Sequence, residues 1–179
     1  MTAEAECGSS IVDWEDYAAF EEFPKTSAFQ EFLELLPQIA AGPPTIRNAR
    51  FRNGSGFSSL ATSPVLEMTT TYLPLGVDAP AYEKIVDSFL PILAKNTKGL
   101  IGSASGWIIE EQESPVAGSA DTKVKAFVVC LAWESIDAHV SSTRIPENKE
   151  AIAPWKAAIL HAEMVCHISH HLIGHLLIQ

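Results

Sequence analysis

The residues from Lys123 to Trp133 read KVKAFVVCLAW and are apolar at almost every position. A strand with one face in water alternates apolar and polar side chains, whereas this run shows no alternation from Ala126 onwards. We therefore expect a central strand with both faces buried. Helices would cover one face, and a second sheet would cover the other.

The segments around this strand predict an α+β fold with the element order β-α-β-β-α-β, which is the ferredoxin-like unit. Gln112 to Asp121, rich in turn residues, separates the two middle strands. The expected strands are residues 65–73, 101–111, 123–133 and 163–171, and the expected helices are residues 79–95, 135–144 and 147–160.

An internal repeat precedes this unit. Ile11 to Glu15 and the two helical segments after it resemble Cys130 to Glu134 and its following helices. When Trp14 is aligned with Trp133, Glu15 falls on Glu134 and Phe20 on His139. Strands at 9–14 and 45–51 would complete the first copy. We expect an incomplete half module at residues 8–52, a linker at 53–64 and a complete module at 65–179.

Composition excludes several classes of protein. Of the 179 residues, 47% are hydrophobic and 19% are charged, which is typical of a folded globule. The net charge of −10 and the lack of any Lys/Arg cluster argue against nucleic-acid binding. No apolar run approaches the roughly 20 residues of a membrane-spanning helix.

The N-terminus is acidic and lacks the features of a signal peptide. The three cysteines, Cys7, Cys130 and Cys166, are an odd number without CxxC spacing, which favours free thiols in a reducing compartment. We expect a cytoplasmic protein. Cys130 and Cys166 lie on predicted strands and are interpreted as buried, inert packing thiols.

The string Trp133-Glu134-Ser135-Ile136-Asp137-Ala138-His139, followed by Pro146 and a helix to Leu160, resembles the dimeric α+β barrel superfamily. These are the antibiotic-biosynthesis-monooxygenase-like and stress-responsive barrel proteins, and the match is most similar to fungal members. The resemblance covers residues 65–171 well and 11–51 in part. It implies a ferredoxin-like dimeric barrel but no single reaction, because members catalyse many different ones.

All six histidines lie in the last 41 residues, so a single active pocket would belong to the second module. His139, near the start of a helix, is the first candidate catalytic residue, with His167 as its helper. The alternative is a structural His139 bonded to Glu134 or to a backbone carbonyl. Because side chains alternate along a strand, His167 and His170 face opposite sides, which argues against a metal site.

The candidate substrate-binding residues are aromatic or acidic side chains on the strands of the second module. Most would ordinarily be core residues, but two Trp and a Tyr could enclose a planar or polycyclic substrate. Glu67 stands on an otherwise apolar strand and is either an exposed edge residue or a pocket carboxylate that acts as acid or base. The set comprises Tyr72, Trp107, Trp133, Phe127 and Glu67.

These features favour a cofactor-independent enzyme of secondary metabolism that cyclises or isomerises an apolar carbonyl compound, pericyclic ring closure included. Cofactor-free oxygenation of a phenolic or polyketide substrate is the alternative within the enzyme class. Two alternatives to such an enzyme stay open. One is a non-catalytic barrel that binds a lipophile. The other is a haem protein with His139, His161 or His167 as axial ligand. A small apolar molecule is the expected partner, with no metal and no nucleotide.

The uncovered face of the sheet predicts a homodimer, because a soluble monomer rarely exposes more than a few hundred Å² of contiguous apolar surface. The first copy supplies only two strands, fewer than the four of a full partner sheet, so closure within one chain, the alternative to a dimer, would be partial. Sedimentation equilibrium should therefore give about twice the chain mass of 19.4 kDa. A strict monomer at all concentrations would contradict the dimer.

Overall fold

The computed structural model describes residues 12, 14–39, 46–52, 57–116 and 122–168, with the backbone alone for Ile39, His167 and Ile168. The chain divides into two compact units at Ile46, and each unit is described by itself. Unit 2 contains the sheet and begins at Arg47.

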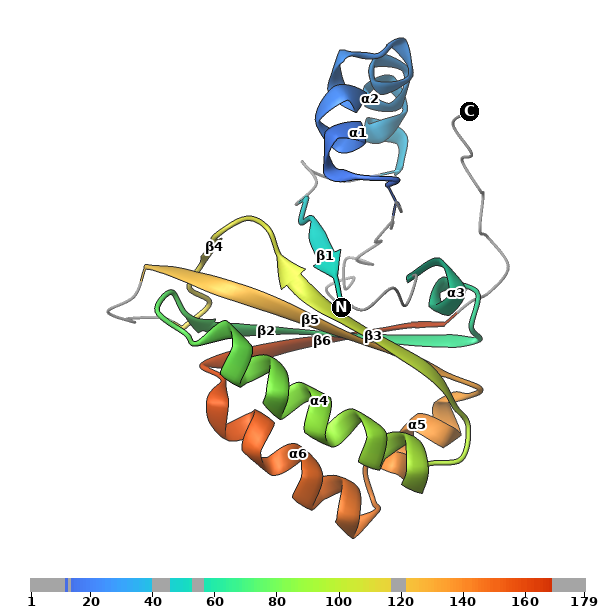
Figure 1. The fold of residues 1–179 in the computed structure, drawn as a ribbon. Coiled ribbons are helices and arrows are strands. Elements are labelled where there is room, and N and C mark those ends of the chain that lie inside the picture. The colour runs from blue at the N-terminus through green and yellow to red at the C-terminus, as the bar shows by residue number, and fades with distance from the viewer. Residues whose placement is uncertain (1–11, 13, 40–45, 53–56, 117–121, 169–179) are drawn as a thin grey trace, which may run out of the picture. The chain divides into compact units, whose positions relative to one another are not determined.

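Unit 2 is built on an antiparallel sheet with the strand order β1-β3-β5-β2-β6 (Figure 1). Within the predicted module the first and third strands, β2 and β5, are the central pair, which is the ferredoxin-like arrangement and confirms the predicted fold class. The short β4 (Gln112–Glu113) pairs only with the start of β5. The main strands are β1 (Ala49–Phe51), β2 (Val65–Pro74), β3 (Leu100–Ile108), β5 (Lys123–Trp133) and β6 (His161–Ile168).

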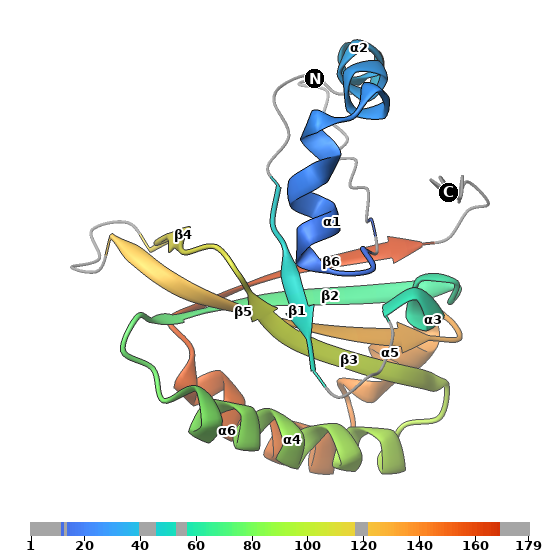
Figure 2. The ribbon, with the colours of Figure 1, turned by 45° about the horizontal axis from the view of Figure 1, so that its top comes forward.

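Two long helices, α4 (Ala79–Asn96) and α6 (Pro146–Ala158), cover one face of the sheet (Figure 2). The side chain of Asp78 caps α4 by accepting a hydrogen bond from the Ala81 amide at 3.1 Å. The buried residues of α4 recur at helical spacing, so a single stripe meets the sheet. That stripe is Tyr82, Val86, Phe89 and Leu93, and it packs on Phe127, Val129, Leu131 and Trp133 of β5.

The other face of β5 is also buried, so the prediction of burial on both faces is confirmed. Part of its cover is a helix that the sequence did not predict. The predicted linker at 53–64 contains α3 (Phe57–Ala61), whose Phe57 and Leu60 pack over one end of this face, on Leu66, Ala104, Val128, Cys130 and Ala132. A short amphipathic helix thus covers part of the face that a second sheet was expected to cover.

The strand predicted at 45–51 forms as β1 but joins the sheet of the module instead of starting another. Phe51 pairs with Gly106 of β3, and the Arg52 amide donates to the Ser105 carbonyl at 2.8 Å. Gly106 permits this pairing, because a Cβ there would lie 2.2 Å from the carbonyl oxygen of Arg50. The expected second sheet from the first copy is therefore wrong for this strand.

Unit 1 consists of α1 (Tyr17–Glu22), a 3₁₀ turn (Phe23–Lys25) and α2 (Ser27–Ile39). Asp16 caps α1 through a hydrogen bond to the Ala19 amide. Aromatic rings hold the two helices together: Phe23 lies 5.2 Å from Trp14 and 5.4 Å from Phe29 between ring centroids. Both helices were predicted.

The remaining sequence expectations differ in detail. The strand expected at 9–14 falls mostly outside the described residues, and Val12 and Trp14 are not in a strand. Helix α5 (Ile136–Ser142) ends two residues earlier than expected. The boundary between units lies at residue 46 instead of 52. The interpretation of the first half as an incomplete copy of the module stays a prediction.

Among the described residues, no helix has the length and apolar character needed to cross a membrane.

We expect Gly106→Ala to detach β1 from β3, because the added methyl group collides with backbone and not with a movable side chain. Crowding of this kind costs about 1–3 kcal/mol of unfolding free energy, and the Arg52 amide should lose protection in hydrogen exchange. Gly76→Ala is the matched control, since nothing lies within 4 Å of its added Cβ. Equal stability of the two variants would contradict this account of β1.

Candidate functional site

A buried carboxylate stands in the apolar face of the sheet beneath the helices. Glu67 on β2 is only 6% exposed. Its Oε2 accepts a hydrogen bond from Trp133 Nε1 at 3.1 Å, and its Oε1 accepts one from Thr69 Oγ1 at 3.2 Å. Val65 pairs with Trp133 in the register of β2 and β5, so Glu67 is a diagonal neighbour of Trp133 on one face. Glu67 is therefore a buried residue of an interior strand and not an exposed edge residue, and its role as acid or base stays a prediction.

His139 on α5 completes this group. Its Nε2 lies 3.3 Å from Glu67 Oε2, an ion pair when the imidazole is protonated, and its ring centroid lies 5.4 Å from that of Trp133. The His139 side chain keeps 16% exposure. Its contact is Glu67 and not Glu134, the partner suggested by the structural alternative.

The chain places His139 here through the start of α5. Ser135 caps the helix by accepting a hydrogen bond from the Ala138 amide at 3.1 Å. The Glu134 amide donates to the Gly99 carbonyl, which ties the helix start to the end of the α4–β3 loop. Gly99 has φ +85°, and a Cβ on it would lie 2.7 Å from Ala138 Cβ, so glycine is required where α5 comes down on the loop.

A cavity of about 160 Å³ opens beside this group, between the sheet and the helices. Its wall is mainly apolar and includes Phe89, Leu93, Ile152 and Trp155. Two lysines, Lys149 and Lys156, also line it. From the sheet and α5 come Glu67, Thr69, Val129, Leu131, Trp133, Met164, His139 and Ser142.

Asn148 of α6 also lines the cavity and is only 1% exposed. Its Nδ2 donates to Thr97 Oγ1 at 2.9 Å and to the Ser142 carbonyl at 3.1 Å. Since a carbonyl only accepts, the amide orientation is determined and Oδ1 is the acceptor. Among the described residues, no donor reaches this buried Oδ1. A buried acceptor of this kind calls for a water molecule or a ligand that donates a hydrogen bond.

The expectation that both strand cysteines are buried is correct for Cys130 and wrong for Cys166. Cys130 is fully buried, and burial raises the pKa of its thiol to about 12. Cys166 lies on β6, the edge strand, where no further strand covers it in the described chain, and it is exposed. Its Sγ is 3.9 Å from His139 Nδ1.

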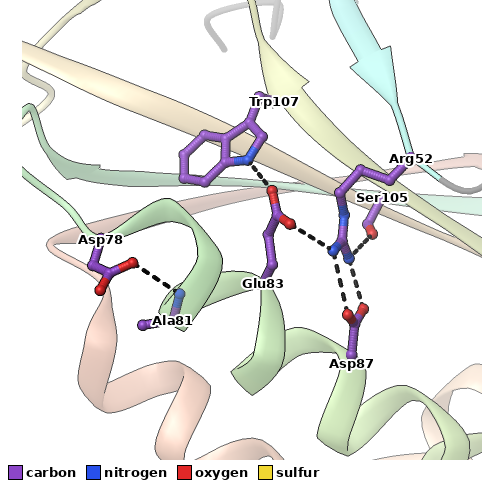
Figure 3. Close-up of polar contacts among 7 residues, drawn as sticks. All are labelled: Arg52, Asp78, Ala81, Glu83, Asp87, Ser105 and Trp107. Atoms are coloured by element: carbon purple, nitrogen blue, oxygen red, sulfur yellow. Dashed lines mark hydrogen bonds and ion pairs between the residues drawn. The ribbon is translucent and has the colours of Figure 1, made fainter.

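Trp107 and Phe127 face the helices but do not line the cavity. Trp107 Nε1 donates to Glu83 of α4 at 2.6 Å, and Arg52 bridges Glu83, Asp87 and Ser105 beside it (Figure 3). The Phe127 ring contacts Trp107 at 4.9 Å. Both aromatic residues are therefore committed to fastening α4 and β1 to the sheet.

Tyr72 lies on the opposite face of the sheet, so the prediction that it lines the same pocket is wrong. Five positions separate it from Glu67, and alternation along β2 turns an odd spacing to the other side. Its hydroxyl donates to Glu163 Oε2 at 2.6 Å. Burial, followed by the hydrogen bond to Glu163, raises the pKa of Tyr72 to about 12.

His167 belongs to β6, where its backbone pairs with Leu66 of β2. Its side chain lies outside the described residues, as do His170, His171 and His175. His161 pairs with Tyr72, and its ring lies 6.0 Å from the Tyr72 ring. Among the described residues no three of His, Cys, Asp or Glu come together as metal ligands do.

The sequence reasoning missed two residues of the pocket region, Asn148 and Cys166. Asn148 carried no signal, because a polar residue in the first turn of a helix is ordinarily solvated. The distance of 27 residues between Cys166 and His139 hid their contact.

Comparisons with known proteins gave structural neighbours only. No family model and no curated protein matches the sequence. Similar solved structures include the cofactor-independent oxygenase SnoaB from Streptomyces nogalater (12% identity, TM-score 0.39, covering 62% of this chain and 95% of that one). A putative monooxygenase from Lactobacillus acidophilus has 13% identity and TM-score 0.49, covering 84% and 64%.

A dimeric ferredoxin-like protein of unknown function from Thermobifida fusca has 14% identity and TM-score 0.41, covering 60% of this chain and 93% of that one. With every TM-score below 0.5, these similarities carry no argument about the family or activity of this chain. At such identities the likeness concerns the fold alone. The chemistry of the pocket has to follow from its own residues.

We expect Trp133→Phe to destabilise the protein by about 1–3 kcal/mol, since it removes a donor from the buried Glu67 carboxylate. In a Glu67→Leu background the same substitution should cost less, because no acceptor is then left unsatisfied. Urea unfolding of the two single variants and the double variant measures the coupling. Additive costs would show that the Trp133–Glu67 bond contributes nothing.

Proposed function

We propose that the protein is a cofactor-independent enzyme that moves a proton on a small, largely apolar carbonyl compound bound in the cavity beside His139. Isomerisation and ring closure are the reactions that suit such a site. The observation that carries the proposal is the 3.3 Å contact between His139 Nε2 and the buried Glu67 at the edge of an apolar cavity.

The pair has the parts of a general acid–base catalyst. With its Nε2 proton directed at Glu67, a neutral His139 presents Nδ1 as the proton acceptor. When Nδ1 takes a proton from the carbon next to a carbonyl, the imidazolium that forms faces a carboxylate held by Trp133 and Thr69. Return of the proton to another carbon completes an isomerisation, and attack of the enolate within the molecule closes a ring.

The cavity volume limits the substrate. A cavity of about 150 Å³ in another protein encloses a benzene molecule, so about 160 Å³ holds one six-membered ring. The polycyclic substrate considered from the sequence does not fit inside this volume. A larger molecule would place one ring in the cavity and the rest outside it.

Oxygenation of a hydroxylated ring is the second candidate. In this reaction His139 would take the proton from the hydroxyl group of a ring bound in the cavity before that ring reacts with oxygen. Oxygen consumption that depends on substrate would distinguish this reaction from isomerisation. A non-catalytic carrier would bind ring compounds and show neither activity.

The expected homodimer stays a proposal. Met164 and Val165 point to opposite faces of the edge strand β6 and are 58% and 51% exposed. Exposed apolar side chains on an edge strand are consistent with cover by another chain.

Exchange of carbon-bound hydrogen tests the proposed function without knowledge of the natural substrate. Deuterium uptake next to the carbonyl of 2-cyclohexenone, followed by NMR in D₂O, should be faster with the protein than without it. His139→Phe, which copies Phe20 of the first half, should lower the protein-dependent rate at least about tenfold, since a general base contributes about 10²–10⁴.

His161→Phe is the matched control, because His161 is exposed and lies in β6 opposite Tyr72, away from the cavity. It should exchange at the rate of the unmodified protein. If His139→Phe retains the full rate, His139 is structural and the proposal fails.

A further inference from the structure

The edge strand β6 brings a thiol to the side of His139 that faces away from Glu67. Cys166 Sγ lies 3.9 Å from Nδ1, while Glu67 Oε2 lies 3.3 Å from Nε2 of the same ring. One imidazole thus connects an exposed thiol to a buried carboxylate. This order of nucleophile, base and orienting acid is the arrangement that activates a nucleophile in covalent catalysis.

The geometry points to Cys166 as a nucleophile, and we propose that it adds reversibly to small conjugated carbonyl compounds whose ring occupies the cavity. The inference rests on the proposed function to the extent that it uses the same base and the same cavity. It goes further by adding a covalent step and by naming α,β-unsaturated ketones as the ligand class.

The position of Cys166 suits this role. Met164, two residues earlier on β6, faces the same side of the sheet and lines the cavity, and Glu67 pairs with Cys166 in the register. The exposed thiol therefore lies on the same face of β6 as Met164 of the cavity wall. Asn148 also lines the cavity, and no donor among the described residues reaches its buried Oδ1.

The step balances without any further reagent. As the Cys166 sulfur bonds to the β carbon, the thiol proton passes to His139 Nδ1 and the double-bond electrons move to the carbonyl oxygen as an enolate. The imidazolium, facing Glu67, then gives the proton to the α carbon. The net change is addition of S–H across C=C, and the reverse sequence releases the unchanged ligand.

The ionisation of Cys166 makes His139 essential to this reaction. Although the residue is exposed, partial desolvation of the thiol, and then the Glu67 carboxylate, raise the pKa of Cys166. Near neutral pH the group is a thiol, and a thiol without an adjacent base reacts slowly because the thiolate is the nucleophile. Removal of the proton by His139 as the bond forms overcomes this, so the reactivity of Cys166 should depend on a residue 27 positions away in the sequence.

The test is alkylation by N-ethylmaleimide, a conjugated carbonyl compound that reacts irreversibly, followed by intact mass and peptide mapping in a Cys7→Ser background. We expect Cys166 to be labelled at pH 7 and the fully buried Cys130 to stay unlabelled in the native protein. His139→Phe should slow labelling of Cys166 at least tenfold. Labelling in that variant should then rise about tenfold per pH unit, as for a thiolate without a base.

Three comparisons make the result decisive. His161→Phe removes an exposed histidine from the same strand as Cys166 and should leave the labelling rate unchanged. His139→Asn is the second variant, used if His139→Phe fails to fold. Incubation with 2-cyclohexenone should give an adduct in the intact mass that disappears on dilution and is lost in Cys166→Ser.

Equal labelling rates with and without His139 would overturn the proposal and leave Cys166 an ordinary exposed thiol. Failure of the two proposals is distinguishable. If deuterium exchange depends on His139 but labelling does not, the proposed function stands and the thiol has no part in it. If labelling depends on His139 but exchange does not, the imidazole is a base for Cys166 and not for carbon.

Discussion

Burial of β5 on both faces is the constraint from which the rest of unit 2 follows. From Ala126 to Trp133 every side chain is buried, so each face needs its own cover. The helices α4 and α6 supply one cover with a stripe of large side chains. On the other face α3 seats Phe57 and Leu60 over the small residues Ala104, Cys130 and Ala132, which leave room for it. The strand β5 therefore packs against two layers, with its large side chains on the helices α4 and α6 and its small ones on α3.

The same burial explains the placement of the polar group. Unpaired charge is expensive in such an interior, so a carboxylate persists there only with partners. Glu67 has Trp133 and Thr69 as donors, and His139 Nε2 lies 3.3 Å away; all of these contacts lie on the helix side of the sheet. The apolar wall of the cavity begins directly beside them. A buried carboxylate beside an imidazole at the edge of an apolar cavity is the feature on which the proposed function rests.

Two glycines hold this arrangement in place from outside the pocket. Gly99 allows α5 to approach the loop before β3, which brings His139 over Trp133. Gly106 allows β1 to pair with β3, and Arg52 at the end of β1 then reaches the acidic residues of α4. Trp107, which the sequence suggested as a pocket residue, instead helps to attach α4 to the sheet through its hydrogen bond to Glu83. Gly99 thus positions α5, while Arg52 and Trp107 attach α4 to the sheet.

The sequence alone determined the elements of the module, because periods of two and 3.6 residues are local and survive without knowledge of partners. It also determined that Glu67 is an anomaly on an apolar strand and that His139 follows the strand of Trp133. The faces of β2 could have been read from alternation too, which would have removed Tyr72 from the pocket. Only the tertiary structure decided that β1 joins the same sheet, that Asn148 lines a cavity, and that Cys166 contacts His139. These contacts depend on strand register and on how each helix is rotated over the sheet, which are set by packing across the whole core and leave no periodic trace in the chain.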